Sequence, residues 1–265
     1  MVPSQRVISL CWLQFFLFIN LASAAEQRGP ILDWNLRRPS EPVGSGGEIL
    51  TAAREFSFTN RNPLQFSADQ PHALCLSGKQ NPLQVELDKK QLAALPTKDF
   101  SLQLWVRPEK QQTEFGLVSF EQDGRPAWLL GGNADHFYFT LASDNKPQPT
   151  QLVARSFYQH AHWYQITATY DGQQQKIYVD GKLAGEAFEQ RGSLLSFDSP
   201  VMQIGALPSK SDDPSHSTDF AGQIAAIRVW NRTLTESEIK SQFTSEHSMF
   251  PGALATYDSS RDWPT

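Results

Sequence analysis

Apolar and polar side chains alternate in twos along the body of this 265-residue chain. Residues 100–107, FSLQLWVR, set Phe, Leu, Leu and Val at every second position, with Ser, Gln, Trp and Arg between them. A two-residue period is typical of a strand that turns one face to a core and the other face outward. Similar strand-like runs follow at 116–120, 127–130, 137–141, 151–156, 164–170, 176–179, 201–204 and 224–230.

Turn-forming residues separate these runs. Asp180-Gly181 joins two of them and predicts a two-residue type I′ hairpin, because that turn needs positive φ angles that Gly adopts freely. One helix is clearly indicated: Thr235 and Glu238 form a capping box that leads into an apolar Ile239. Many strands and one short C-terminal helix predict an all-β, two-sheet antiparallel sandwich.

The N-terminus has the features of a signal peptide. Arg6 precedes an apolar run at 8–21, and the small-residue sequence ASA at 22–24 fits a cleavage site. The run is shorter than the roughly 20 residues that a membrane-spanning helix needs. We therefore expect a cleaved signal peptide over 1–24 and an exported protein without a membrane span after cleavage, whether secreted, periplasmic or on the cell surface.

The charge of the chain limits its possible partners. The chain has 23 Lys and Arg against 28 Asp and Glu, a net charge of −5, and no basic block, so the sequence predicts no nucleic-acid partner.

Signal cleavage leaves Cys75 as the one cysteine, which cannot form an internal disulfide. Its setting, ALCL at 73–76, is typical of a strand, so we expect a packed, unreactive thiol.

Three segments carry a family resemblance: FSLQLWVRP at 100–108, WYQITATYDG at 163–172 followed by IYVDGK at 177–182, and FAGQIAAIRVWNRTLT at 220–235. ALCLSG at 73–78 is similar to the stretch that usually precedes the first. In this order the segments resemble the laminin-G-like jelly-roll domains of the concanavalin A-like lectin/glucanase superfamily. The resemblance implies two curved sheets packed face to face in a jelly roll over 31–244, followed by an irregular tail at 245–265. It supplies no function, because this fold has many.

The acid pattern of the glucanases in that superfamily is incomplete here. Those enzymes carry E-x-D-x-E or E-x-D-x-x-E on one strand, and hydrolysis needs two carboxylates about 5 to 9.5 Å apart. The nearest match, EQDG at 121–124, lacks a third acid and runs into a turn, so we expect Glu121 and Asp123 at a solvated hairpin end. The strand motifs of alginate lyases, a G-x-S-x-G elbow and H-E-x-x-H are also missing. We predict a non-catalytic protein; a glycoside hydrolase or polysaccharide lyase is the less favoured alternative.

Two groups of side chains could bind a metal. His160 and His162 project to one face of a strand, but a polar edge is the favoured interpretation because a third ligand is missing nearby. Three carboxylates precede the last strand and could serve Ca²⁺, which takes six to eight oxygens: Asp212, Asp213 and Asp219. A solvated loop is favoured there, since the relatives' Ile-Asp-Glu-Val is IAAI at 224–227 in this chain. We predict no firm cofactor, with Ca²⁺ the remaining candidate.

Aromatic side chains give the best lead to a ligand, because sugar C–H faces stack on Trp rings while polar neighbours bind the hydroxyls. Trp105 shares the outward face of its strand with Gln103 and Arg107. Trp163 likewise shares a face with Gln165, Thr167 and Thr169. We predict a glycan site on this concave face, with Trp105 as the platform. The alternative is that the N-terminal segment or a loop covers the rings as a second small core.

Together these features predict an exported, non-catalytic binding module for a glycan or another extracytoplasmic surface polymer. The alternative is a protein–protein adhesion module of an exported assembly. An exposed aromatic strip on the concave face would favour sugar, whereas an apolar patch at an edge of the sandwich would favour protein. NRT at 231–233 is a formal N-glycosylation sequon, which we treat as fortuitous because the family motif carries Asn-Arg there anyway.

Overall fold

The computed structural model describes residues 29–36, 57–59, 65–69, 71–78, 83–87, 89–208 and 218–253. The chain divides into two compact units, Met1–Pro30 and Ile31–Thr265, and the described strands and helices belong to the second. The predicted signal peptide at 1–24 lies outside the described residues.

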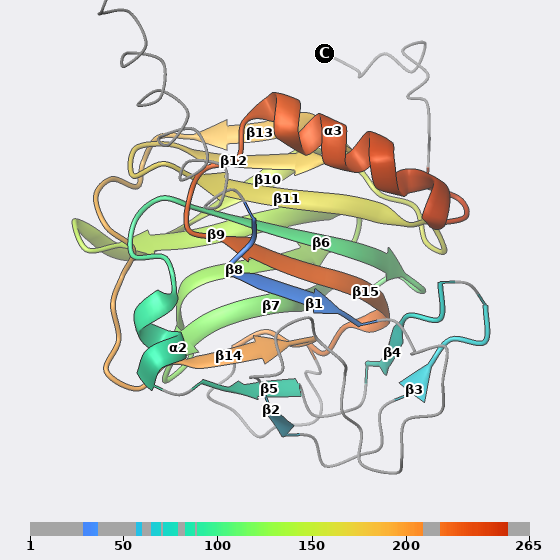
Figure 1. Ribbon diagram of the computed structural model, residues 1–265, viewed down its shortest axis with the longest axis horizontal. Helices are drawn as coiled ribbons and strands as arrows, with labels where there is room; N and C mark the ends of the chain where they lie inside the picture. Colours follow the sequence, from blue (N-terminus) through green and yellow to red (C-terminus); the bar gives the residue numbers. More distant parts are fainter. Residues whose placement is uncertain are drawn as a thin grey trace, which may run out of the picture. The chain divides into compact units, whose positions relative to one another are not determined.

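The first sheet has eight strands in the order β13-β12-β11-β6-β15-β4-β3, with β1 pairing to β15 on the same edge as β4 (Figure 1). All of its pairings are antiparallel. Its strands are β1 (Leu32–Asn35), β3 (Gln65–Phe66), β4 (Leu74–Ser77), β6 (Phe100–Pro108), β11 (Tyr164–Tyr170), β12 (Gln175–Val179), β13 (Lys182–Ala187) and β15 (Ala221–Trp230).

The second sheet has seven strands in the order β10-β9-β8-β7-β14-β5-β2, again antiparallel. Its strands are β2 (Ser57–Thr59), β5 (Leu83–Glu86), β7 (Glu114–Gln122), β8 (Arg125–Asn133), β9 (His136–Ser143), β10 (Lys146–Phe157) and β14 (Val201–Ile204). The helical elements are α2 (Lys89–Ala94), α3 (Glu236–Glu246) and the 3₁₀ turn η2 (His247–Met249). The protein is therefore mostly β, a two-sheet antiparallel sandwich with one short C-terminal helix, as the sequence predicts.

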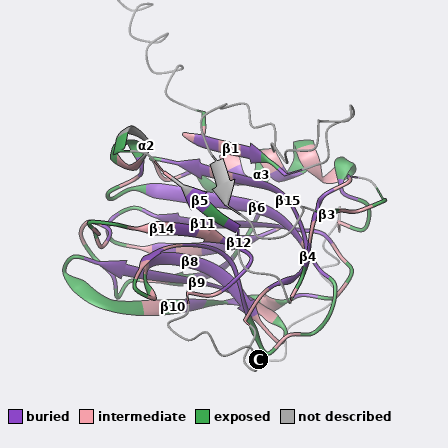
Figure 2. Ribbon diagram, turned by 90° about the horizontal axis from the view of Figure 1, so that it is seen from below, coloured by how far each residue is buried: buried purple, intermediate pink, exposed green. Residues whose placement is uncertain are grey.

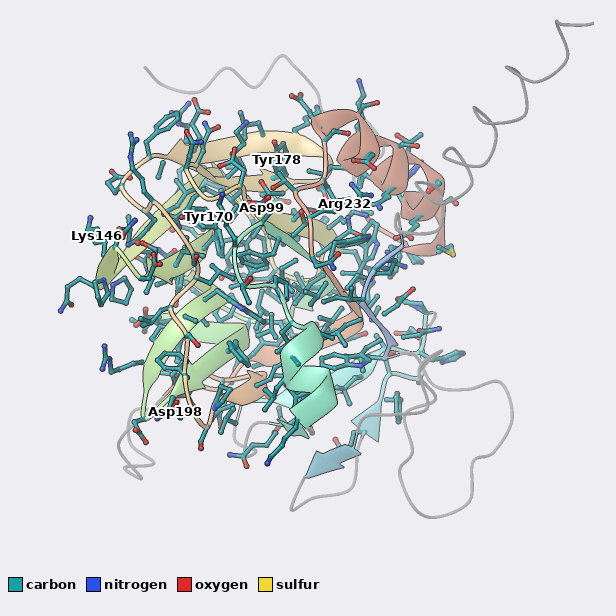
Figure 3. The ribbon with its side chains drawn as sticks, turned by 60° about the vertical axis from the view of Figure 1, so that its left-hand side comes forward. Asp99, Lys146, Tyr170, Tyr178, Asp198 and Arg232 are labelled. Carbon is teal, nitrogen blue, oxygen red and sulfur yellow. The ribbon has the colours of Figure 1, made fainter. Side chains whose placement is uncertain are left out.

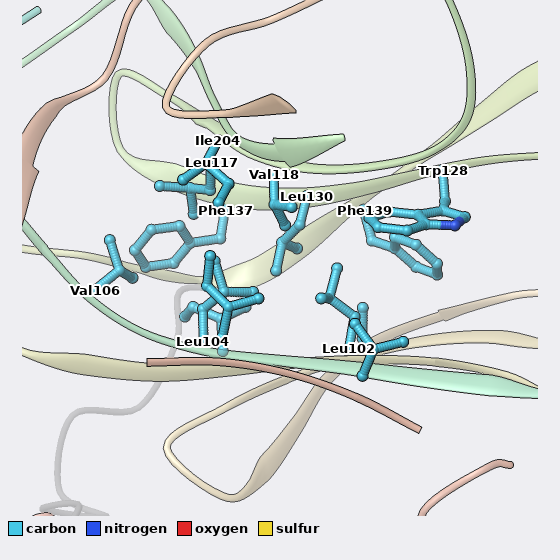
Figure 4. Close-up of a cluster of buried hydrophobic side chains, with 14 of the residues drawn as sticks. Leu102, Leu104, Val106, Leu117, Val118, Trp128, Leu130, Phe137, Phe139 and Ile204 are labelled. Atoms are coloured by element: carbon cyan, nitrogen blue, oxygen red, sulfur yellow. The ribbon is translucent and has the colours of Figure 1, made fainter. Parts of the chain in front are cut away.

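The main core lies between the two sheets (Figure 4). Leu102, Leu104 and Val106 project from β6 toward Leu130 and Phe139 of the other sheet. The alternation in β6 explains this arrangement, because every second side chain of a strand points to the same face. Buried residues follow the strands of both sheets, whereas the end of the β9–β10 hairpin and much of α2 are exposed (Figure 2). Inward-facing residues of the three segments that carry the family resemblance are buried in this core: Leu102, Leu104, Ile166, Ile177, Val179, Ile227 and Val229.

The hairpin between β12 and β13 confirms the predicted turn. Asp180 and Gly181 have φ angles of 50° and 75°, as a type I′ turn requires, and Asp123 and Gly124 repeat the geometry between β7 and β8. The Asp180 carboxylate also accepts a 2.8 Å hydrogen bond from the backbone N–H of Gln165. Burial raises the pKa of Asp180 to about 7.

The helix α3 begins with the predicted capping box: the Thr235 side chain accepts from the N–H of Glu238, whose side chain accepts from the N–H of Thr235. Its buried Ile239 packs with Tyr178 and Trp230 on the outer face of the eight-stranded sheet. Tyr178 and Arg232 lie beside this helix in Figure 3. The helix therefore covers part of the outer face of the eight-stranded sheet, and the apolar–polar alternation alone does not predict this cover.

The predicted irregular tail at 245–265 is wrong in its first part. The helix α3 continues to Glu246, η2 follows, and Phe250 is buried. The chain stays ordered here because Phe250 finds an aromatic partner on the sheet, Trp105. Residues 254–265 lie outside the described part of the chain.

Candidate functional site

Trp105, the predicted platform, is fully buried. Its ring stacks on Phe250, with centroids 3.9 Å apart and planes 10° apart, and Phe243 of α3 lies 5.9 Å away. Trp163 is 2% exposed and packs against the same Phe250 at 5.2 Å. Small side chains complete this second core: Ala73, Ala225 and Ala226. The geometry fits the covered alternative, and within the described residues the rings of Phe243 and Phe250 in the C-terminal segment form the cover.

Polar side chains surround this second core. Gln103 is 1% exposed; it donates 2.8 Å to Gln242 of α3 and accepts 3.0 Å from Arg228. Glu246, the last residue of α3, accepts from the indole Nε1–H of Trp105 at 2.7 Å and pairs with Arg228 at 2.8 Å. Side chains that face outward from a sheet thus find partners in the helix instead of water.

Arg107 lies at the edge of this arrangement. Its Nε donates 3.0 Å to the carbonyl of Ala161, and its guanidinium pairs with Glu109 at 2.9 Å. The structure therefore brings Trp105, Trp163 and Gln103 together under one cover and directs Arg107 to other partners.

Glu121 corrects another prediction, because it does not lie at a solvated hairpin end. It is 5% exposed, and its carboxylate accepts from the N–H of Gly124 at 2.7 Å and from Gln203 at 3.2 Å. Burial raises the pKa of Glu121 above its ordinary value. Asp123 is exposed in the turn. The motif therefore contributes one buried carboxylate, whereas glycoside hydrolysis uses two facing carboxylates.

A row of hydrogen-bonding side chains crosses the outer face of the seven-stranded sheet. The residues on either side of it along each strand face the main core, so the row faces away from that core. The strand registers align its members, which we call the polar row: Gln151, Thr140, Leu129, Ser119, Gln203 and Gln84. Five of the six are polar and uncharged. The two ends of the row, Gln151 and Gln84, are exposed and Gln203 is half-buried, whereas Thr140, Leu129 and Ser119 are buried. The Oγ of Ser119 has no hydrogen-bond partner.

Two aromatic side chains lie on the same outer face as the polar row: the buried Tyr138, two residues from Thr140 on β9, and Phe157. The ring of Tyr138 lies against Gly131, where an added Cβ would come within 2.9 Å of it, and its hydroxyl donates 3.1 Å to Glu114. Burial raises the pKa of Tyr138, so the phenol stays protonated. At the end of β10, Phe157 is 55% exposed and its ring lies 4.4 Å from that of His136.

Sequence reasoning missed the polar row because its members come from six strands. Each strand contributes a single residue, and only the pairing of β10, β9, β8, β7, β14 and β5 aligns these residues. The signal available in the sequence was the alternation itself, which places each member on the outward face.

The potential metal ligands are spread apart. Within the described residues, no group of three His, Cys, Asp or Glu side chains is arranged to hold a metal ion. His162 Nδ1 lies 2.8 Å from the carbonyl of His160, and Ala161 between them has a φ of 61°, so the chain turns here rather than running as a strand. Asp219 is half-buried, and its carbonyl accepts from Gln112 at 2.6 Å. Asp212 and Asp213 lie outside the described residues.

Large exposed apolar side chains gather on or directly after two edge strands. β10 and β13 end their respective sheets and contact each other across the edge of the sandwich. In the described part of the chain, four of the five large exposed hydrophobics belong to this edge: Val153, Phe157, Leu183 and Phe188. As for membrane insertion, neither helix that the structure describes combines the length and the apolar character needed to span a bilayer.

Curated relatives match part of the chain. Pappalysin-1 from Mus musculus is 28% identical over 200 residues, which cover 69% of this chain and 12% of that protein. Pappalysin-1 from Homo sapiens is 28% identical over 199 residues with the same coverage. The chain thus spans about an eighth of the length of these relatives.

Solved structures share the fold. The botulinum neurotoxin type C protein whose cell entry depends upon interaction with two ganglioside molecules superposes with a TM-score of 0.60 at 16% identity, over 84% of this chain and 52% of that one. The binding domain of Paraclostridial Mosquitocidal Protein 1 gives a TM-score of 0.62 at 13% identity, over 83% and 52%. This chain covers about half of each neighbour, and such identities show the fold alone.

A laminin G family model, described as the concanavalin A-like lectin/glucanases superfamily, matches residues 78–240. This range is more than half of the chain and includes all three segments on which the resemblance rests, together with the last residue of the 73–78 stretch. The two-sheet sandwich agrees with it. The chain belongs to the concanavalin A-like lectin/glucanases superfamily.

Proposed function

We propose that this protein is an exported, non-catalytic carbohydrate-binding module whose glycan lies along the polar row. The proposal rests on the polar row, because its side chains can form hydrogen bonds with sugar hydroxyls. Amide and hydroxyl side chains both donate and accept hydrogen bonds, and none of the row's members carries a charge. The row is also long enough for a chain ligand, since six strands about 4.8 Å apart span roughly 24 Å.

Two further observations support a ligand at the row. The Oγ of Ser119 is buried without a partner, and a bound hydroxyl would satisfy it. The exposed Phe157 lies on the same face, opposite His136 and four residues along β9 from Thr140, and such a ring can pack on a sugar C–H face. The likeness to binding domains adds a general argument for a binding role, and the gangliosides named for the type C neurotoxin are a property of that protein.

A protein partner is the second candidate, and one observation favours it. Val153, Leu183 and Phe188 are exposed on or beside the two edge strands. An apolar patch at the edge of a sandwich is a common feature of protein interfaces. In this alternative the chain is an interaction module of an exported assembly.

A glycan array on the mature protein, with and without Ca²⁺, tests the first candidate. We expect Gln84→Ala and Gln151→Ala to weaken binding of the best glycan several-fold, because both side chains are exposed members of the row. Gln173→Ala, an exposed glutamine in the turn before β12, is the matched control. Equal glycan affinity of all variants would exclude the row as the site. If Leu183→Asp abolishes glycan binding and the glutamine variants do not, the site lies at the edge formed by β10 and β13.

Export has its own test. N-terminal sequencing of the protein recovered from its native source should begin near Ala25, after the predicted cleavage sequence at 22–24. Recovery of the intact N-terminus would contradict processing at this position.

A further inference from the structure

The segment Glu246–Ala253, which we call the C-terminal strap, buries few of its side chains. Phe250 is buried, and half-buried Ala253 packs against the same second core. Glu246 bonds to Trp105 and Arg228 of the sheet, and His247 stacks on Phe243. Met249 is 43% exposed, and Ser248, Pro251 and Gly252 are exposed as well. Segments with so few buried contacts open at lower free energy than the strands beneath them.

The contacts of Phe250 and Glu246 converge on the indole of Trp105, and Phe250 also packs against Trp163. The ring of Phe250 stacks on the face of Trp105, while the carboxylate of Glu246 accepts from Nε1–H of the same indole. That carboxylate also pairs with Arg228 at 2.8 Å. The strap therefore presents a flat ring and a carboxylate to a surface made of a Trp ring, a Trp N–H and an Arg.

The sheet face beside Trp105 has hydrogen-bonding capacity that its cover does not use. Gln165 lies directly across from Trp105 in the β6–β11 register, on the same face, and is 0% exposed. Neither the nitrogen nor the oxygen of its side-chain amide has a hydrogen-bond partner. A buried amide without partners is rare in native structures and indicates a group that the closed form fails to satisfy.

We propose that the strap is a detachable cover over a binding slot for an acidic sugar, a pyranose that carries a carboxylate. The sugar's C–H face would replace Phe250 on Trp105, and its carboxylate would replace Glu246 on Arg228 and the indole N–H. Its hydroxyls would reach the amide of Gln165. The rest of α3 stays in place, because Ile239 and Phe243 anchor it. The slot is on the opposite sheet from the polar row and does not depend on it.

Hydrogen exchange on the mature wild-type protein tests whether the cover opens. The informative amides are those with backbone hydrogen bonds inside the strap, at Phe250 and Ala253. We expect them to exchange at least about a hundredfold faster than the central amides of β6, and faster still when an oligogalacturonate is added. Exchange as slow as that of β6 would show that the strap opens only with global unfolding, and would overturn the proposal.

Calorimetric titration with oligogalacturonate and a matched neutral galactose oligomer tests the slot. We expect Phe250→Ala to bind the acidic oligomer about tenfold more tightly than wild type, because affinity scales with the open fraction. Met249→Ala, an exposed residue of the same strap, is the matched control and should leave affinity unchanged. Arg228→Gln should abolish the preference for the acidic oligomer.

Two outcomes would contradict the slot. One is a Phe250→Ala protein with a native circular dichroism spectrum and no gain in affinity for the acidic oligomer; the other is equal affinity of wild type for both oligomers. Gln84→Ala separates this proposal from the polar row, because it should weaken glycan binding at the row and leave oligogalacturonate binding unchanged. If Phe250→Ala does not fold, the exchange rates of the wild-type strap decide.

Discussion

Replacing Trp105 with Ala tests the second core directly. The ring is fully buried between the sheet and the C-terminal segment, stacks on Phe250, and donates a hydrogen bond to Glu246. Truncating a buried Trp to Ala costs about 3 to 5 kcal/mol, because transfer free energy is lost and a cavity remains. For a domain of 150–250 residues, this corresponds to a fall in Tm of roughly 6 to 20 °C. Thermal melting followed by far-UV circular dichroism measures it.

Phe157→Ala is the matched control for this measurement. Its ring is 55% exposed on β10, so its removal should change stability by less than about 0.5 kcal/mol. Trp105→Phe adds a second comparison, since it keeps an aromatic ring for Phe250 and removes the donor to Glu246; we expect an intermediate loss of stability. A Tm for Trp105→Ala within 2 °C of wild type (about the control's change) would refute the packing of this core.

Three further predictions concern titratable groups. Burial raises the pKa of Asp180 to about 7, so the folded protein binds this proton more tightly than the unfolded chain and loses stability as pH rises from about 4 through 7. Asp180→Asn should remove that loss, which urea melts at pH 5 and pH 8 would measure, and Asn-Gly also suits the turn. The hydrogen bond from Arg232 lowers the pKa of Glu238 to about 2. The ionised Glu238 therefore stabilises the fold above the pKa of the unfolded chain, and this contribution is lost as pH falls through 2. Glu238→Gln should lower Tm at pH 7 but not at pH 2. Burial raises the pKa of the half-buried Cys75 thiol, so native protein should react with a maleimide far more slowly at pH 7 than urea-unfolded protein, and equal rates would contradict its placement on β4.

The sequence determined the local features of the fold. The alternation in residues 100–107 predicted both β6 and its inward face, because side chains of a strand alternate with a fixed period. Asp180-Gly181 predicted a type I′ turn, and the pair of Thr235 and Glu238 predicted the start of α3. Each of these features depends on residues a few positions apart, so a single sequence contains all the information that they need.

Only the tertiary structure decided what each outward face contacts. The alternation of β6 would be the same if Gln103 and Trp105 were exposed to water or covered by a helix. In the structure, Gln242 and Glu246 accept the hydrogen bonds that water would otherwise accept from them. Phe250, 145 positions along the chain, is the residue that covers Trp105. The polar row likewise exists only after strand pairing, which aligns residues as distant as 84 and 203. Long-range packing decides which strands pair and which segment covers a face. The side-chain period of a single strand does not determine either.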